Sequence, residues 1–128
     1  MRRFLILLFL FSADLTADPE SHYMIHCMGC HLADGAGLPP EVPAFGNQLG
    51  RFAQTDRGRA YLIRVPGAAQ SPINDQALAD VINWMLYRYS AATLPEDFRP
   101  FDEDEVARHR KNILKDPQRL RKTLEQKS

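Results

Sequence analysis

The chain has 128 residues, with 16 basic and 16 acidic side chains and a formal net charge of zero at pH 7. This length indicates one domain and is too short for a dinucleotide-binding fold joined to a substrate domain. A near-neutral chain with no basic block beside its two cysteines is not expected to bind nucleic acid. Two cysteines exclude a scaffold of several disulfides.

Residues 1–17 have the pattern of a secretory signal peptide. Arg2 and Arg3 precede a run of large apolar residues, Phe4 to Phe11, and small residues follow as far as Ala17. The run is shorter than the roughly 20 residues that a membrane-spanning helix needs, so no stable membrane anchor is expected. We expect cleavage after Ala17, with Ala13 as the alternative, and a periplasmic mature protein.

The two cysteines belong to the pattern Cys27-Met28-Gly29-Cys30-His31, which is the C-x-x-C-H attachment motif of c-type haem. Two thiols on one helical turn reach the two vinyl groups of one porphyrin, and His31 then lies under the iron as its ligand. The motif therefore predicts one covalent haem c. The alternatives are a thioredoxin-like redox pair, a structural disulfide, or a zinc site with His22, His26 or His109.

The stretch from His31 to Gly50 is rich in glycine and proline, and we predict a loop wrapped over the flat cofactor. A haem-ligating histidine needs an acceptor that orients its ring, and a carbonyl in a rigid loop serves this purpose. Pro43 lies in this loop, where its other interpretation is an ordinary turn residue.

With these residues the chain resembles a class I, monohaem cytochrome c over about Pro19 to Ala92. In that family the carbonyl of a proline twelve residues after the haem histidine accepts a hydrogen bond from that histidine, and Pro43 stands at this spacing. Asp34-Gly35-Ala36-Gly37 is typical of bacterial members. The resemblance implies an all-α, cytochrome c-like fold around one haem over residues 18–92. It also implies a monomeric electron carrier.

Two helical segments are expected after the loop. Arg57 to Val65 is predicted as a short helix or extended turn, and Asp75 to Tyr89 as a helix that Asn74 or Asp75 caps. The apolar face of the second segment consists of Leu78, Val81, Ile82, Met85 and Leu86. The resemblance pairs Tyr23 with Trp84 where the first and last helices of the domain cross.

The sixth ligand of the iron decides the function. Most electron-carrying relatives supply a methionine from the loop that is Val65 to Asp75 here, and this loop holds no Met, His, Cys or Lys. Met85 is the thioether candidate by elimination, with an ordinary core position as its alternative. The other options are an open or water-filled site, or a ligand from His22, His109, Gln70 or Asn74.

A methionine on the iron predicts an electron carrier between a dehydrogenase or other redox partner and the respiratory chain, through an oxidase. An open iron predicts instead a five-coordinate haem protein that binds a diatomic gas. Nothing beyond an open iron argues for catalysis, so we do not expect an enzyme.

The two haem carboxylates require charge-assisted donors, which we predict to be Arg59, Tyr61 and Trp84, with Arg51 and Arg57 as further candidates. The alternative is that the arginines are surface residues. Residues 93–128 form a separate charged segment that is acidic first and basic last. It is expected to be a solvated helical extension or a docking arm for a redox partner.

Overall fold

The computed structural model describes residues 18–126, and the predicted signal peptide lies outside them. The described residues contain helices and no β-strand, apart from an isolated bridge between Leu38 and Val42. The predicted all-α fold is therefore confirmed. In chain order the elements are α1 (Pro19–His26), α2 (Met28–His31), α3 (Gln48–Phe52), α4 (Asp56–Arg64), α5 (Pro66–Ala69), α6 (Asp75–Tyr89), the 3-10 helix η1 (Ala91–Thr93), α7 (Glu103–Arg110) and α8 (Pro117–Glu125).

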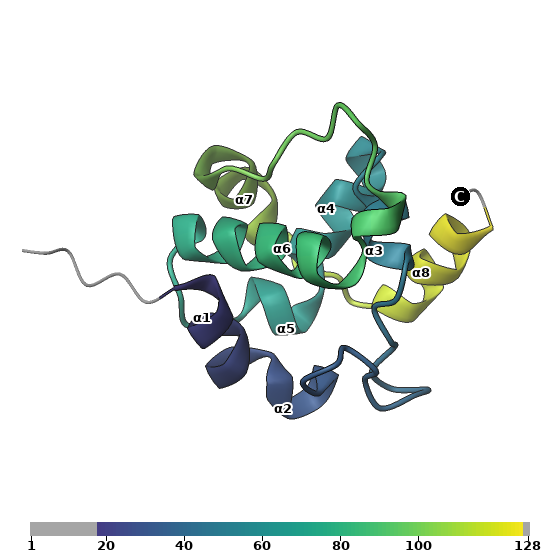
Figure 1. Ribbon diagram of the computed structural model, residues 1–128, viewed down its shortest axis with the longest axis horizontal. Coiled ribbons are helices and arrows are strands. Elements are labelled where there is room, and N and C mark those ends of the chain that lie inside the picture. The colour runs from purple at the N-terminus through teal and green to yellow at the C-terminus, as the bar shows by residue number, and fades with distance from the viewer. Residues whose placement is uncertain (1–17, 127–128) are drawn as a thin grey trace, which may run out of the picture.

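Helix α6 crosses the middle of the molecule and spans the residues predicted for it (Figure 1). The side chain of Asn74 caps its start by accepting a hydrogen bond from the backbone N–H of Ala77 at 2.8 Å. Helix α1 packs against α6. The ring centroids of Tyr23 and Trp84 lie 5.1 Å apart at this crossing, which confirms the predicted pair.

Local sequence explains where the shorter helices begin. The side chains of Asp18, Thr55, Asp102 and Asp116 each accept a hydrogen bond from the backbone N–H three residues later, at the starts of α1, α4, α7 and α8. Proline occupies the first turn of α1, α5 and α8, where its missing N–H costs no helical bond. These caps matter because short helices are marginal without packing.

One hydrophobic core runs through the whole described chain. Tyr23, Phe52 and Leu86 are almost fully buried, and so is Val106 of α7. Leu124 of α8 belongs to the same cluster. The core therefore includes residues beyond the predicted end of the cytochrome domain at residue 92.

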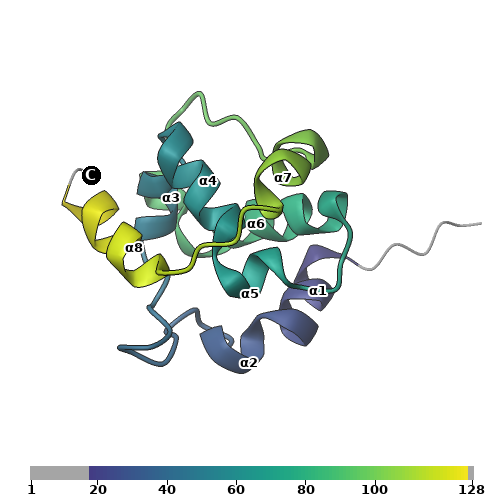
Figure 2. The ribbon, with the colours of Figure 1, turned by 180° about the vertical axis from the view of Figure 1, so that it is seen from behind.

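The C-terminal segment, residues 93–126, packs against the rest of the molecule. Helix α7 lies against α4 and α6, and α8 lies against α4. Figure 2 shows the segment between α7 and α8 crossing the back of the molecule. Along this crossing the N–H of Leu114 donates to the carbonyl of Arg64 at 3.0 Å, and Nε of Arg64 donates to the carbonyl of Asn112 at 2.6 Å. These contacts correct the expectation of a solvated extension, because its apolar side chains complete the core.

A buried ion pair joins α4 to α7. Nε and Nη2 of Arg59 donate to the two carboxylate oxygens of Glu105 at 2.8 and 2.6 Å. Nη1 of Arg59 donates to the carbonyl of Arg99 at 2.8 Å. The side chains of Arg59 and Glu105 are 6% and 5% exposed. Two parallel bonds in a buried setting make this a geometrically specific contact.

Breaking this pair should destabilise the protein. Arg59→Gln is expected to lower the free energy of unfolding by about 3 kcal/mol or more, because it leaves a buried carboxylate without its partner. Arg57→Gln, at an exposed position of the same helix, should change that free energy by less than about 0.5 kcal/mol. Denaturant unfolding followed by circular dichroism measures both variants. Equal stability of the two would show that the pair does not hold α7 in place.

Candidate functional site

The cysteine–histidine motif forms the junction of α1 and α2. Cys27 ends α1, and its N–H donates to the carbonyl of Tyr23 at 2.9 Å. The N–H groups of Cys30 and His31 both donate to the carbonyl of Cys27, at 3.2 and 3.0 Å. Both thiols are free, with Cys27 half-buried and Cys30 exposed. The motif residues therefore share one helical turn.

The surroundings of the motif bear on its other interpretations. A thioredoxin-like pair needs a strand before the first cysteine, whereas helix α1 occupies that position. The histidines named for a zinc site are dispersed. His22 and His26 lie on α1 with ring centroids 5.9 Å apart, whereas His109 lies on α7. The helical start at Pro19 thus removes the structural context of a thioredoxin-like site.

The imidazole of His31 is half-buried and packs against an aromatic ring. Its Nδ1 atom is buried and has no hydrogen-bond partner. The ring of Phe45 stacks on it, with centroids 4.2 Å apart and planes inclined by 23°. Burial, and then the positive charge of Arg121, lower the pKa of His31 below its usual value. A neutral imidazole is the form that binds a metal ion.

Two tyrosines hold the end of the motif helix. The hydroxyl of Tyr23 donates to the carbonyl of Leu32 at 2.5 Å, and the hydroxyl of Tyr89 donates to the carbonyl of Ala33 at 2.9 Å. Burial, and then the neighbouring Tyr89, raise the pKa of Tyr23, so it remains a protonated donor. The two rings lie 5.8 Å apart and both approach Phe45. This cluster fixes α2 against α1 and α6.

The structure differs from the hydrogen bond expected between His31 and Pro43. The loop places the carbonyl of Pro43 close to Gly37, where an added Cβ would lie 2.9 Å from that oxygen. Gly37 has a φ of +67° and donates its N–H to the carbonyl of His31 at 3.1 Å. Pro43 is thus linked to His31 through Gly37, while Nδ1 of His31 stays unpartnered. A direct bond from Pro43 remains a prediction for the haem-bound protein.

The donor groups of Arg59 are not free for the predicted contact with a haem carboxylate. Its donors are used by Glu105 and by the carbonyl of Arg99, at the contact of α4 with α7. An arginine already paired in this way has little left to offer a haem carboxylate. Arg51 and Arg57, the other predicted donors, are exposed on α3 and α4.

The remaining predicted residues lie on two helices, with Tyr61 on α4 and Trp84 and Met85 on α6. Tyr61 is buried on α4, with its ring 5.4 Å from that of Phe52. Burial raises the pKa of Tyr61, and the nearby Arg121 opposes this shift. Trp84 helps to line a hollow of about 210 Å³ together with Met28 of the motif. Met85 is half-buried on α6 and packs against the core.

Arg121 is the site residue that the sequence analysis missed. It comes from α8, is buried, and donates from Nη2 to the carbonyl of Ala44 at 3.2 Å. Its Nε pairs with Glu125 at 2.7 Å. It is 77 positions from Ala44 in the chain, and no local pattern signals a contact at such a separation.

The loop Val65–Asp75 is also held by the C-terminal segment. Arg110 of α7 donates to the carbonyls of Ala69 and Ile73 at 3.0 and 2.7 Å, and to Asp75 at 2.8 Å. It also donates to the carbonyl of Ser71. One guanidinium therefore fastens the Val65–Asp75 loop to α7.

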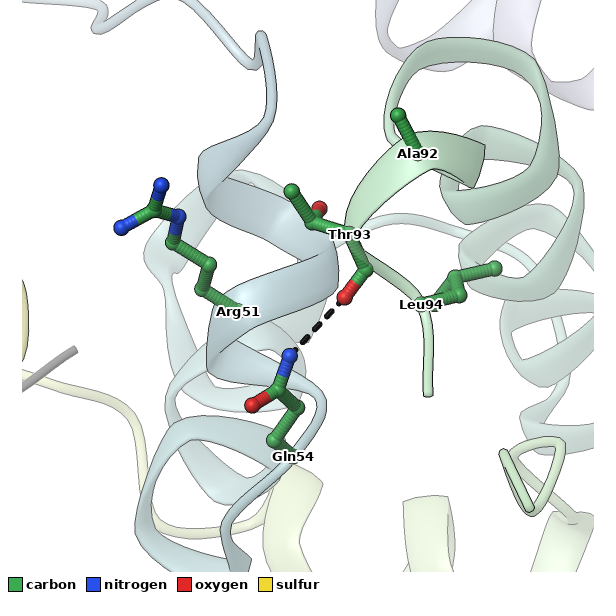
Figure 3. A pocket seen from close by; sticks show the side chains of 5 residues that line it. All are labelled: Arg51, Gln54, Ala92, Thr93 and Leu94. Atoms are coloured by element: carbon green, nitrogen blue, oxygen red, sulfur yellow. Dashed lines mark hydrogen bonds between the residues drawn. The ribbon is translucent and has the colours of Figure 1, made fainter. Parts of the chain in front are cut away.

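A larger hollow, of about 430 Å³, lies between α3 and the chain around η1 (Figure 3). Arg51 and Gln54 line one side and Ala92, Thr93 and Leu94 the other. Nε2 of Gln54 donates to the carbonyl of Thr93 at 2.9 Å across it. None of the motif residues lines this hollow, so it is separate from the candidate site.

Comparisons with known proteins support the interpretation of the motif. The chain is 28% identical over 106 residues to a cytochrome c-552 of Thermus thermophilus, a match that covers 69% of this chain and 81% of the relative. It is 26% identical over 106 residues to a second cytochrome c-552 of that organism, covering 69% and 72% of the two chains. No family model and no solved structure matches the chain. The similarity supports a c-type cytochrome.

Removing the guanidinium of Arg110 should loosen the Val65–Asp75 loop. Arg110→Ala is expected to lower the free energy of unfolding by about 2 kcal/mol, because several loop carbonyls and Asp75 lose a charged donor. Hydrogen exchange of the loop amides should be faster in this variant. Arg108 is an exposed residue on α7, and Arg108→Ala should leave the exchange rate of these amides unchanged. Unaltered exchange in the Arg110 variant would contradict this account of the loop.

Proposed function

We propose that this chain is an exported monohaem c-type cytochrome that carries electrons. The observation that carries the proposal is the single helical turn that presents two free thiols and an imidazole whose buried Nδ1 has no hydrogen-bond partner. The similarity to cytochromes c-552 supports the same conclusion. Cys27 and Cys30 would form the two thioether bonds, and His31 would bind the iron.

The residues around the motif fit a haem c. A Cβ added at Gly29, between the two cysteines, would meet no atom within 4 Å, so this side of the motif is open. His31 offers a buried nitrogen that lacks a protein partner. Tyr23, Phe45 and Tyr89 provide aromatic surface that would shield the group from water. When bound, the haem iron would accept and donate one electron by cycling between its ferric and ferrous states.

The wider role rests on the signal-peptide pattern of residues 1–17 and on the expectation that the protein is not an enzyme. We propose a periplasmic monomer that takes electrons from a dehydrogenase or other redox partner and passes them toward the respiratory chain, without acting as an enzyme. No helix within residues 18–126 has the length and apolar character required to cross a bilayer. The redox partner protein is the only partner proposed, and nucleic acid is not one.

The iron ligand opposite His31 is proposed to be Met85. Met85 is half-buried on α6, the helix that also packs against α1 beside the motif. A thioether ligand favours ferrous iron and so raises the reduction potential. The alternative function, binding of a diatomic gas at an open iron, rests on the absence of Met, His, Cys and Lys from the Val65–Asp75 loop.

Haem attachment is tested by mass spectrometry of exported protein. The mass should correspond to the chain beginning at Asp18 plus one haem, and Cys27→Ala combined with Cys30→Ala should remove the haem. Met28→Ala, within the same motif, should retain it. His31→Gly should abolish the spectrum of the native protein because the iron loses its protein ligand. Two reactive thiols in the mature, unaltered protein would overturn the proposal.

The spectrum of the oxidised protein tests Met85. A thioether–iron bond gives a weak charge-transfer band in the far red, and Met85→Ala should remove this band and lower the potential. Met24→Ala, an exposed methionine on α1, is the control and should change neither. If the unaltered protein lacks the band and its reduced form binds carbon monoxide readily, the iron is open, and gas binding replaces electron transfer as the function.

A further inference from the structure

A buried arginine on α8, paired with the exposed Glu125, lies against the loop that follows the motif. The Arg121 residue is 8% exposed, and its guanidinium carbon lies 5.4 Å from the ring centroid of Phe52. Its Nη2 donates to the carbonyl of Ala44 at 3.2 Å, and its Nε to Glu125 at 2.7 Å. Burying a cation is costly, and an apolar side chain would fill this place without that cost. The charge itself therefore calls for an explanation.

This cation lies close to the histidine of the motif. Ala44 directly precedes Phe45, whose ring stacks on the imidazole of His31 at 4.2 Å. Through Ala44 and Phe45, the positive charge of Arg121 lies next to the ring that stacks on His31, so it interacts electrostatically with a charge that changes there. In a buried setting such an interaction is weakly screened by water and salt.

We propose that Arg121 raises the reduction potential of the haem carried by the Cys27–His31 motif, which makes α8 part of the redox site. The inference rests on the proposed function. Ferric haem carries one more positive charge than ferrous haem, so a buried cation nearby disfavours the oxidised state. Glu125 opposes this effect, because its carboxylate offsets part of the charge of Arg121. Arg121 is thus a positioning residue that acts through charge.

The two members of the pair provide a test with opposite signs. In redox titrations of the haem-loaded protein, Arg121→Gln should lower the potential, so that the ratio of reduced to oxidised protein at a fixed applied potential falls several-fold. Glu125→Gln should raise that ratio. Lys122→Gln, an exposed residue on the same helix, is the control and should leave it nearly unchanged. The shift at Arg121 should persist at high salt because its side chain is buried, whereas the shift at the more exposed Glu125 should shrink.

Two further measurements separate charge from folding. Arg121→Lys keeps the charge but loses the planar fork, so it should keep most of the potential while lowering the unfolding midpoint. Glu125→Gln carries the test alone if Arg121→Gln fails to fold. If the reduction potentials of Arg121→Gln and Glu125→Gln both equal that of Lys122→Gln, the inference is overturned. The proposed function then still stands. Unaltered protein without covalent haem would overturn both.

Discussion

The crossing of α1 and α6 through aromatic rings is the contact on which the position of the motif depends. Tyr23 comes one turn before Cys27 and packs against Trp84 of α6. Its hydroxyl, with that of Tyr89, binds the two carbonyls that follow the motif helix. The same rings contact Phe45, which covers His31. The thiols and the imidazole are therefore oriented by contacts with the core.

A helical domain of residues 18–92 would bury little apolar surface, and small domains of this kind need an additional source of stability. The C-terminal segment supplies part of it. Val106 is fully buried, and Leu124 belongs to the same core. Polar contacts accompany this burial, since Glu105 and Arg110 reach α4 and the loop before α6. The covalent haem would add a further apolar surface near the motif.

The sequence predicts those features that depend on neighbours in the chain. The spacing of Cys27, Cys30 and His31 locates the candidate site, and a cap with apolar periodicity locates α6 to the residue. The hydrogen-bond partners of Arg59 and Arg121 lie 46 and 77 positions away in the chain, and a local pattern does not encode such contacts. The composition of residues 93–128 indicated helices correctly but not their docking, because a charged helix with a few buried residues resembles a solvated one.

The contacts of α7 and α8 with the rest of the molecule affect the order in which the fold forms. The motif lies near the beginning of the chain and is synthesised early, whereas Glu105, Arg110 and Arg121 come last. Their long-range contacts close loops of 35 to 77 residues, so they form only when the chain is nearly complete. Until then the loop over His31 lacks its contact with α8. The contact of α8 with this loop is therefore among the last to form, and the loop next to His31 takes its final place only when the C-terminal helix has folded.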